Sequence, residues 1–338
     1  KKQGIDVKVN DTIRMENPYF YRNKLQYPLG LDNEGKPIMG VFASRSHRVI
    51  ETRECMIQNK RLQEIANGIF KFIKENKIPV YDEQNRSGQI RHLVLRIGIK
   101  TKEVMVTIVS NEEKIKFESG LVEYINENFK DVKTIIKNVN SQNTNVILGK
   151  KNIVLYGDGY IEDDILGFKF KISPMSFYQV NPVQTEKLYS KAIELADLKG
   201  DETIFDLYCG IGTIGICASS KIQKLYGIET LPEAIEDAKK NASLNNIENS
   251  EFFAGDVEKA LPEFIEKNNI KPDVIFIDPP RKGCDNVAIE TILKIAPEKI
   301  VYVSCNPATL SRDLKMFSNM YELKEVTPVD MFPFTRTY

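Results

Sequence analysis

A cysteine follows an apolar run near the end of the chain, where a thiol could act as a nucleophile. Ile300–Val303 form a β-type run, and Ser304 and Cys305 follow it directly. Asn306 and Pro307 then break the strand and are typical of a helix start. Side chains at such a strand end lie at the edge of a sheet, where α/β proteins place their chemistry. We therefore predict that Cys305 is a nucleophile; the alternative is a buried structural thiol, the usual state of a free cysteine.

Glycine and acidic residues at three earlier strand ends could hold a second reactant. Gly210, Gly212 and Gly215 follow an apolar run, and such a turn lets backbone come close to a ligand. Glu229 ends the next run, where an acid that binds a ribose is expected. Asp256 follows one strand later and could accept a hydrogen bond from an adenine amine, or it could cap a helix. The glycine turn alone fits NAD as well as S-adenosylmethionine, but three successive strand ends carry more weight together.

The run Asp278-Pro-Pro-Arg281 distinguishes between these two cofactors. Two prolines directly after a buried strand force a rigid, non-helical exit. Such an exit holds backbone carbonyls and the Asp278 carboxylate toward the crevice. An enzyme that clamps a planar base beside a methyl donor needs this feature, whereas a dehydrogenase does not. We therefore favour S-adenosylmethionine; the alternative is a proline-rich connection with Asp278 as a turn residue.

These strand ends belong to an alternating pattern of strands and helices that begins near Asn181. Helix starts are predicted at Asn181-Pro182 and, through a capping box, at Thr230-x-x-Glu233. The βαβ repetition implies a doubly wound, mainly parallel sheet. Its strands are expected at residues 203–208, 224–228, 251–253, 273–277 and 299–303.

The first half of the chain shows mostly strand patterns, interrupted by two helices. Helices are expected at 61–75, where apolar residues recur at helical spacing, and at 121–129. This pattern predicts an α+β domain. Its strands are expected at residues 20–28, 38–44, 92–99, 103–109, 132–139, 153–156 and 168–172.

Basic and aromatic residues alternate between Arg14 and Arg61. The basic set includes Arg22, Lys24 and Lys60, and Tyr19, Phe20, Tyr21 and Tyr27 lie among them. This composition suits contacts with phosphates and stacking on bases. The alternative, which spacing alone favours, is a solvated strand face whose aromatic side chains point into a core.

Composition limits the class of protein. The chain has 338 residues, of which 42% are hydrophobic and 28% charged, so two ordinary globular domains are expected. The formal net charge of +0 argues against a strong non-specific binder of polyanions. Its 5 cysteines are scattered and only 2 histidines are present, so we expect no zinc site and a reducing cytoplasm. No apolar stretch reaches the length of a membrane span.

Several motifs together resemble those of the bacterial RNA (uracil-5-)-methyltransferases. In the second half they are Asp206-Leu-Tyr-Cys-Gly-Ile-Gly-Thr, Asp278-Pro-Pro-Arg-Lys-Gly283, Ser304-Cys-Asn-Pro-Ala-Thr-Leu-Ser-Arg-Asp313 and Asp330-Met-Phe-Pro333. Earlier in the chain they are Asn17-Pro-Tyr-Phe-Tyr-Arg-Asn-Lys24 and Ser176-Phe-Tyr-Gln-Val-Asn181. The resemblance covers nearly the whole chain. It implies a Rossmann-like class I methyltransferase domain at residues 175–338, preceded by an α+β central, RNA-binding domain at residues 1–174.

The resemblance also implies a reaction: transfer of a methyl group from S-adenosylmethionine to C5 of a uridine in RNA. Uracil C5 is a poor nucleophile until a thiolate adds to C6, and Cys305 would supply that thiolate. Phe177 would stack on the flipped uracil, and Arg281 would contact the substrate. The expected cofactor contacts are Gln179, Tyr208, Gly210, Gly212, Glu229, Asp256 and Asp278.

The sequence departs from the family pattern in two places. The family's proton-abstracting glutamate follows the Met-Phe-Pro element, but no glutamate follows Met331, so we expect the base beyond Tyr338 and poor turnover by this chain. Members often carry an N-terminal RNA-binding barrel and a 4Fe-4S cluster held by four cysteines, and neither the barrel nor the cysteine triplet precedes Asn17. Cys55 matches the fourth ligand, so it is either a cluster ligand whose partners are missing or an ordinary buried cysteine.

Other functions remain open at this point. The expected substrate is 23S rRNA rather than tRNA uridine-54, and the protein is expected to be a cytoplasmic monomer. An RNA cytosine-5 methyltransferase also uses a strand-end cysteine, but it usually has another cysteine where Pro280 and Arg281 stand. An amino-group methyltransferase would need an aromatic ring at Arg281 and has no use for Cys305. A dehydrogenase rests on the glycine turn alone, and a non-enzymatic RNA-binding scaffold is a further alternative.

Overall fold

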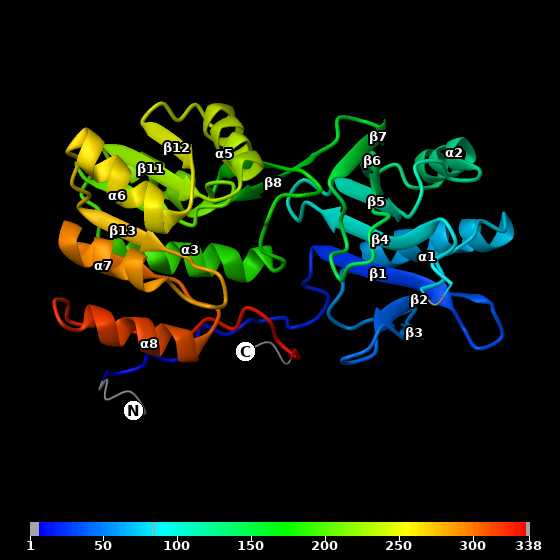
Figure 1. Ribbon diagram of the computed structural model, residues 1–338, viewed down its shortest axis with the longest axis horizontal. Coiled ribbons are helices and arrows are strands. Elements are labelled where there is room, and N and C mark those ends of the chain that lie inside the picture. The colour runs from blue at the N-terminus through cyan, green and yellow to red at the C-terminus, as the bar shows by residue number, and fades with distance from the viewer. Residues whose placement is uncertain (1–6, 84, 336–338) are drawn as a thin grey trace.

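The computed structural model describes residues 7–83 and 85–335. Two sheets lie beside each other along the long axis of the molecule (Figure 1). The N-terminal sheet has the strand order β3-β2-β1-β4-β5-β6-β7. Its strands are β1 (Lys24–Leu31), β2 (Pro37–Phe42), β3 (Val49–Glu51), β4 (Ile90–Ile97), β5 (Val104–Ser110), β6 (Val132–Val139) and β7 (Lys151–Tyr156).

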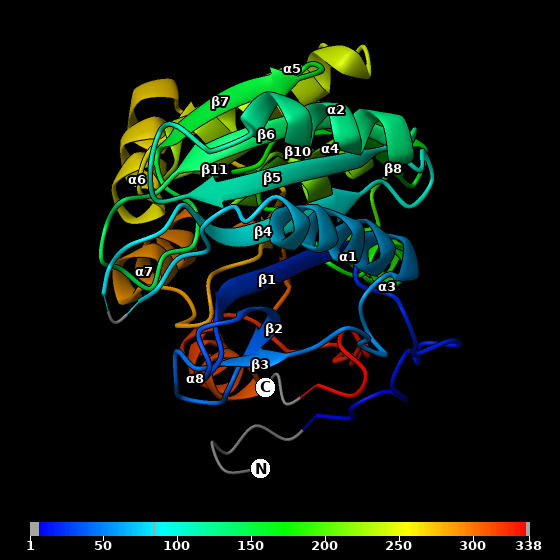
Figure 2. The same ribbon diagram turned by 90° about the vertical axis from the view of Figure 1, so that its right-hand side faces the viewer.

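Helices α1 (Lys60–Glu75) and α2 (Glu118–Asn128) cover one face of this sheet (Figure 2). Leu62, Ile65, Ile69 and Ile73 of α1 are buried against inward-facing strand residues such as Leu95. The helix begins after Asn59, whose side-chain oxygen accepts hydrogen bonds from the first backbone N–H groups. The predicted helix at 61–75 is therefore confirmed, and the predicted α+β character of this half holds.

In the first half, the predicted starts of one strand and one helix were inaccurate, and two strands were missed. The strand expected from Phe20 begins only at Lys24, because Phe20 has a left-handed φ of 55° that interrupts extended backbone. The helix expected from Leu121 begins at Glu118, one turn earlier. Strand β3 and strand β8 (Ile161–Ile165) were not predicted. β3 is a short edge strand of three residues, which leaves little pattern to detect.

The C-terminal sheet is wholly parallel and has the order β12-β11-β10-β13-β14. The chain runs outward from β10 in one direction through β11 and β12, then returns to the other side of β10. This order makes the sheet doubly wound and confirms the predicted Rossmann-like methyltransferase fold. The strands are β10 (Thr203–Leu207), β11 (Lys224–Glu229), β12 (Ser250–Ala254), β13 (Val274–Ile277) and β14 (Lys299–Tyr302).

Helices cover both faces of the parallel sheet, and each face has its own core. The first group packs with Ile204 and Phe276 and consists of α3 (Pro182–Ala196), α4 (Thr213–Ala218) and α5 (Pro232–Leu244). The second group packs with Phe205 and Ile277 and consists of α6 (Val257–Asn268), α7 (Asn286–Ile295) and α8 (Pro307–Phe317). Because both faces are buried, the strands are almost continuously apolar.

Two of three predicted helix starts are correct. The Asn181 side chain accepts a hydrogen bond from Gln184 N, and Asn306 accepts one from Ala308 N, each followed by proline. The capping box at Thr230 is wrong. Helix α5 begins after Leu231 with no side-chain cap, and the N–H of Leu231 donates to the Glu229 carboxylate.

The two halves are joined by more than one segment. The hairpin of β8 and β9 (Phe168–Ile172) precedes residue 174, yet its apolar residues belong to the core beneath α3. The predicted domain boundary after residue 174 stays a prediction. Near the termini, Val9 pairs with Val326 and Ile13 with Val329. The helices that the structure describes include none with the length and apolar character of a membrane span.

Candidate active site

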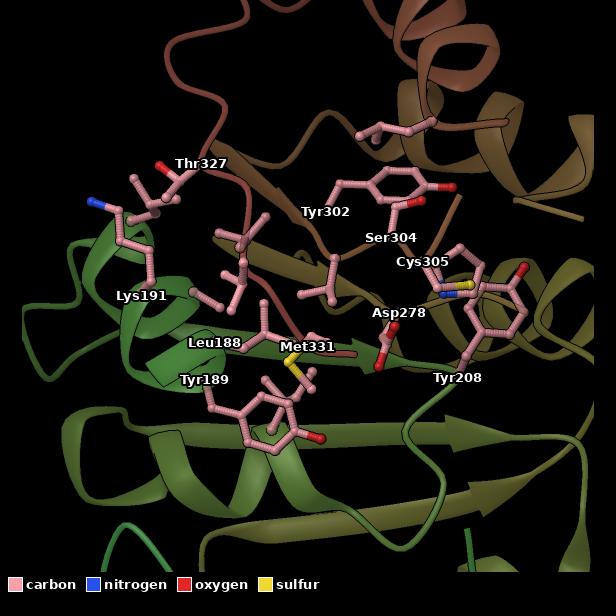
Figure 3. A pocket seen from close by; sticks show the side chains of 18 of the residues that line it. Leu188, Tyr189, Lys191, Tyr208, Asp278, Tyr302, Ser304, Cys305, Thr327 and Met331 are labelled. Carbon is pink, nitrogen blue, oxygen red and sulfur yellow. The ribbon is translucent and has the colours of Figure 1, made fainter. Parts of the chain in front are cut away.

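A large cavity opens where the carboxyl ends of the parallel strands meet. It encloses about 2520 Å³, and part of that space extends between α3, β14 and residues 322–333. Figure 3 shows Cys305, Asp278 and Tyr208 in one part of this cavity, with Lys191 and Thr327 at its far end. Most of the predicted site residues line it: Phe177, Gln179, Tyr208, Gly210, Glu229, Asp256, Asp278, Arg281 and Cys305.

Cys305 is exposed at the end of β14, as expected of a nucleophile and not of a structural thiol. The other second-half cysteines, Cys209, Cys217 and Cys284, are buried, and burial raises the pKa of each thiol. A buried thiol with a raised pKa forms little thiolate and has poor access to a substrate. Cys305 is therefore the cysteine of this half that is placed to react with a molecule in the cavity.

The loop that carries Cys305 is tied to the loop after β13. Asn306 Nδ2 donates to the Arg281 carbonyl at 3.3 Å, and Thr309 Oγ1 donates to the same oxygen at 3.4 Å. Ser304 Oγ accepts from Asn306 N at 3.1 Å and so shapes the turn. These contacts fix Cys305 relative to the Asp-Pro-Pro-Arg element. The Arg281 side chain is exposed at the same mouth.

Two acidic side chains at the cavity have pKa values above the usual range of a carboxyl group. Burial raises the pKa of Asp278 to about 7. Burial also raises the pKa of Asp206 to about 7; the N–H of Gly215 opposes this shift, while the charges of Asp278 and Glu229 add to it. Asp206 is 1% exposed, and its Oδ1 has no hydrogen-bond partner among the residues the structure describes. A cation in the cavity would stabilise both carboxylates.

The glycine turn is positioned by Glu229. The N–H of Gly210 donates to Glu229 Oε2, and the N–H of Leu231 donates to Oε1, each at 3.1 Å. Gly210 has a left-handed φ of 55°, and a Cβ there would meet nothing within 4 Å. The turn therefore leaves open space above its backbone, and the carboxylate is held at the end of β11.

Gly212 supports this turn but does not line the cavity. Its φ is 82°, and a Cβ would come within 3.1 Å of Ile216 and Phe252. The structure thus gives Gly212 a packing role at the start of α4. A direct contact between Gly212 and the cofactor stays a prediction. Its support is the contribution of Gly212 to the shape of the turn.

Asp256 occupies the N-cap position of α6, yet its side chain makes no capping hydrogen bond. Its backbone carbonyl accepts from Lys259 N and Ala260 N instead. The side chain is exposed to the cavity, which favours the ligand-binding interpretation over the capping one. Nearby, the Tyr208 hydroxyl donates to Glu258 Oε1 at 3.4 Å.

The segment of residues 176–181 brings Phe177 and Gln179 to the cavity from its other side. Phe177 is 68% exposed, although it lines the cavity. The hydroxyl of Ser176 donates to Asp237 Oδ2 of α5 at 2.9 Å, which anchors the segment to the C-terminal half. A large exposed aromatic ring at a cavity mouth is suited to stacking on a planar ligand.

Cys55 lies elsewhere, in the turn before α1. Its backbone N–H and carbonyl are both bonded to the Gln63 side chain, at 2.6 and 3.0 Å. Within residues 7–83 and 85–335, no three His, Cys, Asp or Glu residues gather in a way that could hold a metal ion. The described residues therefore provide no complete ligand set of their own, and Cys55 as a cluster ligand stays a prediction.

Sequence reasoning gave no site role to Asp206 or Asp313, although both lie in quoted motifs. Asp313 is fully buried and accepts from Cys284 N at 2.9 Å and from the Tyr302 hydroxyl at 2.6 Å. It also forms an ion pair with Arg312. Asp313 thus ties the loop after β13 to β14 and α8, the two elements that flank Cys305 in the chain. A charged residue at a helical position that would face the core was the available signal.

The cavity fits S-adenosylmethionine, a cationic cofactor with a nucleoside. The unpartnered oxygen of Asp206 and the carboxylate of Asp278 provide negative charge where the strands end. Glu229 and Asp256 provide hydrogen-bond acceptors on the next two strands. When bound, S-adenosylmethionine supplies an electrophilic methyl group. Arg281 and Phe177 stand at the mouth, where a second, larger reactant would enter.

Comparison with known proteins agrees with this reading. The sequence model of the tRNA (Uracil-5-)-methyltransferase family matches residues 121–338. An uncharacterized RNA methyltransferase of Clostridium tetani is 48% identical over 330 residues, which is 97% of this chain and 71% of the relative. One from Staphylococcus aureus is 45% identical over 97% of this chain and 72% of its own length.

A solved structure also resembles the whole chain. The tRNA (uracil-54, C5)-methyltransferase of Pyrococcus abyssi, solved in complex with S-adenosyl-L-homocysteine, aligns with a TM-score of 0.80 and 28% identity. The alignment covers 96% of this chain and 76% of that protein. Similarity of this extent, in both sequence and fold, shows that the chain belongs to the tRNA (uracil-5-)-methyltransferase family of RNA-modifying enzymes.

Proposed function

We propose that this protein methylates C5 of a specific uridine in RNA, with S-adenosylmethionine as methyl donor and Cys305 as nucleophile. The observation that carries the proposal is the shared cavity of Cys305 and Asp278. An exposed thiol and a partly buried carboxylate lie at neighbouring strand ends, and hydrogen bonds from Asn306 and Thr309 tie their loops together. This arrangement supports a nucleophile and an acidic cofactor contact that face the same cavity.

In the proposed reaction, Cys305 activates the uracil for methyl transfer to C5. The Cys305 thiolate adds to C6 of the uracil, and the electrons of the C5–C6 double bond move toward C5 and the C4 carbonyl. C5 then takes the methyl group from the sulfonium, and S-adenosylhomocysteine is the leaving product. A base removes the C5 proton, the double bond re-forms and the thiolate leaves. The family's glutamate base stays a prediction, and Tyr338, which it would follow, lies outside the described residues.

The remaining site residues have proposed roles in holding the two reactants. Phe177 would stack on the uracil taken out of its helix or loop, and Arg281 would contact the RNA at the mouth. Glu229 would accept from the ribose hydroxyls of the cofactor, and Asp256 from its adenine amine. Gln179 and Tyr208 would flank the methionine part and Asp278 would balance its positive charge. The Gly210–Gly212 turn would pass beneath the cofactor.

For the substrate we propose 23S rRNA, in a monomeric cytoplasmic enzyme. A second candidate is uridine-54 of tRNA, which is supported by the structural similarity to the Pyrococcus abyssi enzyme of that specificity. A cytosine-5 methyltransferase would share Cys305 but would give 5-methylcytidine.

The test is to map 5-methyluridine in cellular RNA with and without the gene. The proposal predicts loss of one 5-methyluridine from 23S rRNA in the strain that lacks the gene. Loss from tRNA would support the second candidate. An unchanged 5-methyluridine pattern, or loss of 5-methylcytidine instead, would contradict the proposed function.

A further inference from the structure

Two cations lie side by side on the N-terminal sheet at its junction with the catalytic half, and a third precedes them in the chain. Lys24 of β1 and Arg96 of β4 are direct cross-strand partners, and Arg22 precedes Lys24 by two residues. Their neighbours Leu25 and Leu95 point into the core beneath α1, so Lys24 and Arg96 point to the opposite face. Figure 1 shows β1 beginning where the two halves meet.

Arg96 is buried and Arg22 and Lys24 are partly buried, and none of the three has a compensating negative charge in the described part of the chain. Arg96 is 5% exposed, and its Nε and Nη1 atoms have no hydrogen-bond partner in the described part of the chain. The buried Nε of Arg22 also lacks a hydrogen-bond partner there, and the Arg22 guanidinium lies 6.0 Å from the centroid of the Phe332 ring. Within residues 7–83 and 85–335, no carboxylate forms an ion pair with Arg22, Lys24 or Arg96. Buried charges without a partner are costly, so such a group in a protein usually has a ligand.

Burial disfavours the protonated forms of Lys24 and Arg96, and the proximity of Arg96 adds to this effect at Lys24. Burial and the adjacent Arg96 lower the pKa of Lys24 to about 7. Burial also lowers the pKa of Arg96 to about 10. A bound anion would reverse both effects, because it supplies the opposite charge and accepts the free N–H groups.

The cluster touches the segment that carries Phe177 and Gln179. Arg96 Nη2 donates to the Ser176 carbonyl at 2.7 Å. Asn23, between Arg22 and Lys24, donates from its side chain to the Gln179 carbonyl at 3.2 Å and from its backbone to Val180 at 2.9 Å. An anion held here would therefore lie immediately behind the residues that line the catalytic cavity.

We propose that Arg22, Lys24 and Arg96 form a binding site for a backbone phosphate of the RNA, next to the nucleotide whose base enters the cavity. The inference rests on the proposed function, since RNA is the polyanion that the catalytic half must engage. A guanidinium with free N–H groups and a flexible ammonium together match the oxygens of a phosphodiester. The site would fix the RNA backbone while Phe177 engages the extruded base.

The closing experiment measures how RNA affinity depends on salt. The wild-type chain and a Lys24→Met variant are titrated with a uridine-containing stem-loop between low and high salt. Lys24→Met removes the charge but keeps the stem, and Lys24 makes no hydrogen bond that holds residues 176–181. Because each phosphate contact releases condensed counterions, we expect the slope of log Kd against log salt to fall by roughly 0.7–0.9. Lys24→Arg should restore most of the slope.

A matched variant controls for net charge. Lys71 lies on α1, is 71% exposed in its side chain and, among the residues that the structure describes, forms an ion pair with Glu75 alone. Lys71→Met should therefore leave the slope unchanged. Binding of S-adenosylmethionine should be the same in all variants. If Lys24→Met does not fold, amine labelling of wild-type Lys24 with and without the RNA replaces it, and protection is expected.

The outcomes separate this site from the proposed function. An unchanged slope in folded Lys24→Met, a loss equal to that of Lys71→Met, or unprotected Lys24 would overturn the site while wild-type RNA binding stands. Failure of the wild-type chain to bind any uridine-containing RNA would contradict the proposed function and the site together.

Discussion

Each of the two sheets of this protein carries buried or partly buried charged side chains that form no ion pair within residues 7–83 and 85–335, and the sign of their charge differs between the sheets. At the edge of the parallel sheet, Asp206 and Asp278 are carboxylates whose pKa burial raises to about 7. On the N-terminal sheet, Lys24 and Arg96 are cations whose pKa burial lowers. The acids lie at the cavity where a cationic cofactor fits, and the cations lie where RNA would pass. Each half thus carries the charged side chains that its own reactant, of opposite charge, would neutralise.

The acidic side chains of one half do not form ion pairs with the cations of the other half, and this separation has a physical reason. An ion pair between the halves would stabilise the free protein, but it would have to break before either reactant could bind. Kept apart, each group gains its partner only in the complex, so the binding of the reactant recovers the cost of burial. Variants of each half should therefore affect one reactant and leave the other unchanged.

The largest effect is expected from Cys305→Ala, which belongs to neither charge set. Methyl transfer in cells should fall by roughly 10³-fold or more, because removing a nucleophile leaves only binding to accelerate the reaction. Complementation of a gene deletion, with 5-methyluridine as readout, measures this. Methylation by Cys305→Ala near the wild-type level would remove the covalent mechanism.

The next effect tests the acidic half. Asp278→Asn should weaken S-adenosylmethionine binding by about 30-fold, which corresponds to about 2 kcal/mol for the loss of one partner of a buried charge pair. Calorimetry measures the affinity directly. RNA affinity should remain as in the wild type. A parallel loss of RNA binding would show that the two halves are not independent.

Stacking by Phe177 should have an intermediate effect on RNA alone. Phe177→Ala should weaken RNA binding by about 1–3 kcal/mol, the range for losing one base–aromatic stack. Phe117→Ala is the matched control, since Phe117 is also an exposed phenylalanine, at 52%, but lies at the start of α2. If both variants bind RNA equally well, Phe177 does not hold the base.

The pH dependence of cofactor binding tests whether the ionised forms of Asp206 and Asp278 hold the cofactor. With folded pKa values near 7, Asp206 and Asp278 hold protons below pH 7 that the unfolded chain has already released. Unfolding free energy from these groups therefore falls as pH rises from about 4 to 7. A cationic cofactor favours the ionised form, so its affinity should rise as pH increases toward 7 and then level off. Asp278→Asn should flatten this profile, and an affinity that falls over the same range would contradict it.

The smallest effect concerns the loop after β13. Gly283 has a φ of 79°, and a Cβ there would come within 2.5 Å of Asp313 Oδ2. Gly283→Ala should lower the free energy of unfolding by about 1–3 kcal/mol. Gly35 has a φ of 75° with nothing within 4 Å, so Gly35→Ala should cost less and isolates the contact with Asp313. Equal losses in denaturant unfolding would mean that only backbone strain matters.

Much of the acidic half could be predicted from sequence, because its signals are local. Cys305, Asp278 and Glu229 each follow an apolar run directly, and parallel strands bring such ends to one edge. The two correct helix starts likewise depend on adjacent Asn-Pro pairs. The failed one at Thr230 shows the limit of this reasoning: Glu229 binds the N–H of Leu231, and the helix begins one residue later than the box requires.

The cationic half could not be predicted in the same way. Lys24 and Arg96 are 72 positions apart and meet only through strand register, which no local pattern specifies. The contact of Arg96 with Ser176 joins residues 80 positions apart. Basic and aromatic residues near Lys24 suggested RNA, but they equally suited a solvated face. Only the fold shows which of these cations lose contact with solvent without gaining an ion-pair partner among the described residues.

Trapping the covalent intermediate tests most directly whether Cys305 is the nucleophile. The protein is incubated with S-adenosylmethionine and an RNA that carries 5-fluorouridine, whose C5 fluorine blocks the final proton removal and should trap the adduct. Peptide mapping by mass spectrometry then identifies the modified residue. We expect a 5-fluoro-5-methyl-5,6-dihydrouridine nucleotide attached through C6 to the Cys305 sulfur. An adduct on another cysteine, or the absence of any adduct with an RNA that the protein binds, would contradict it.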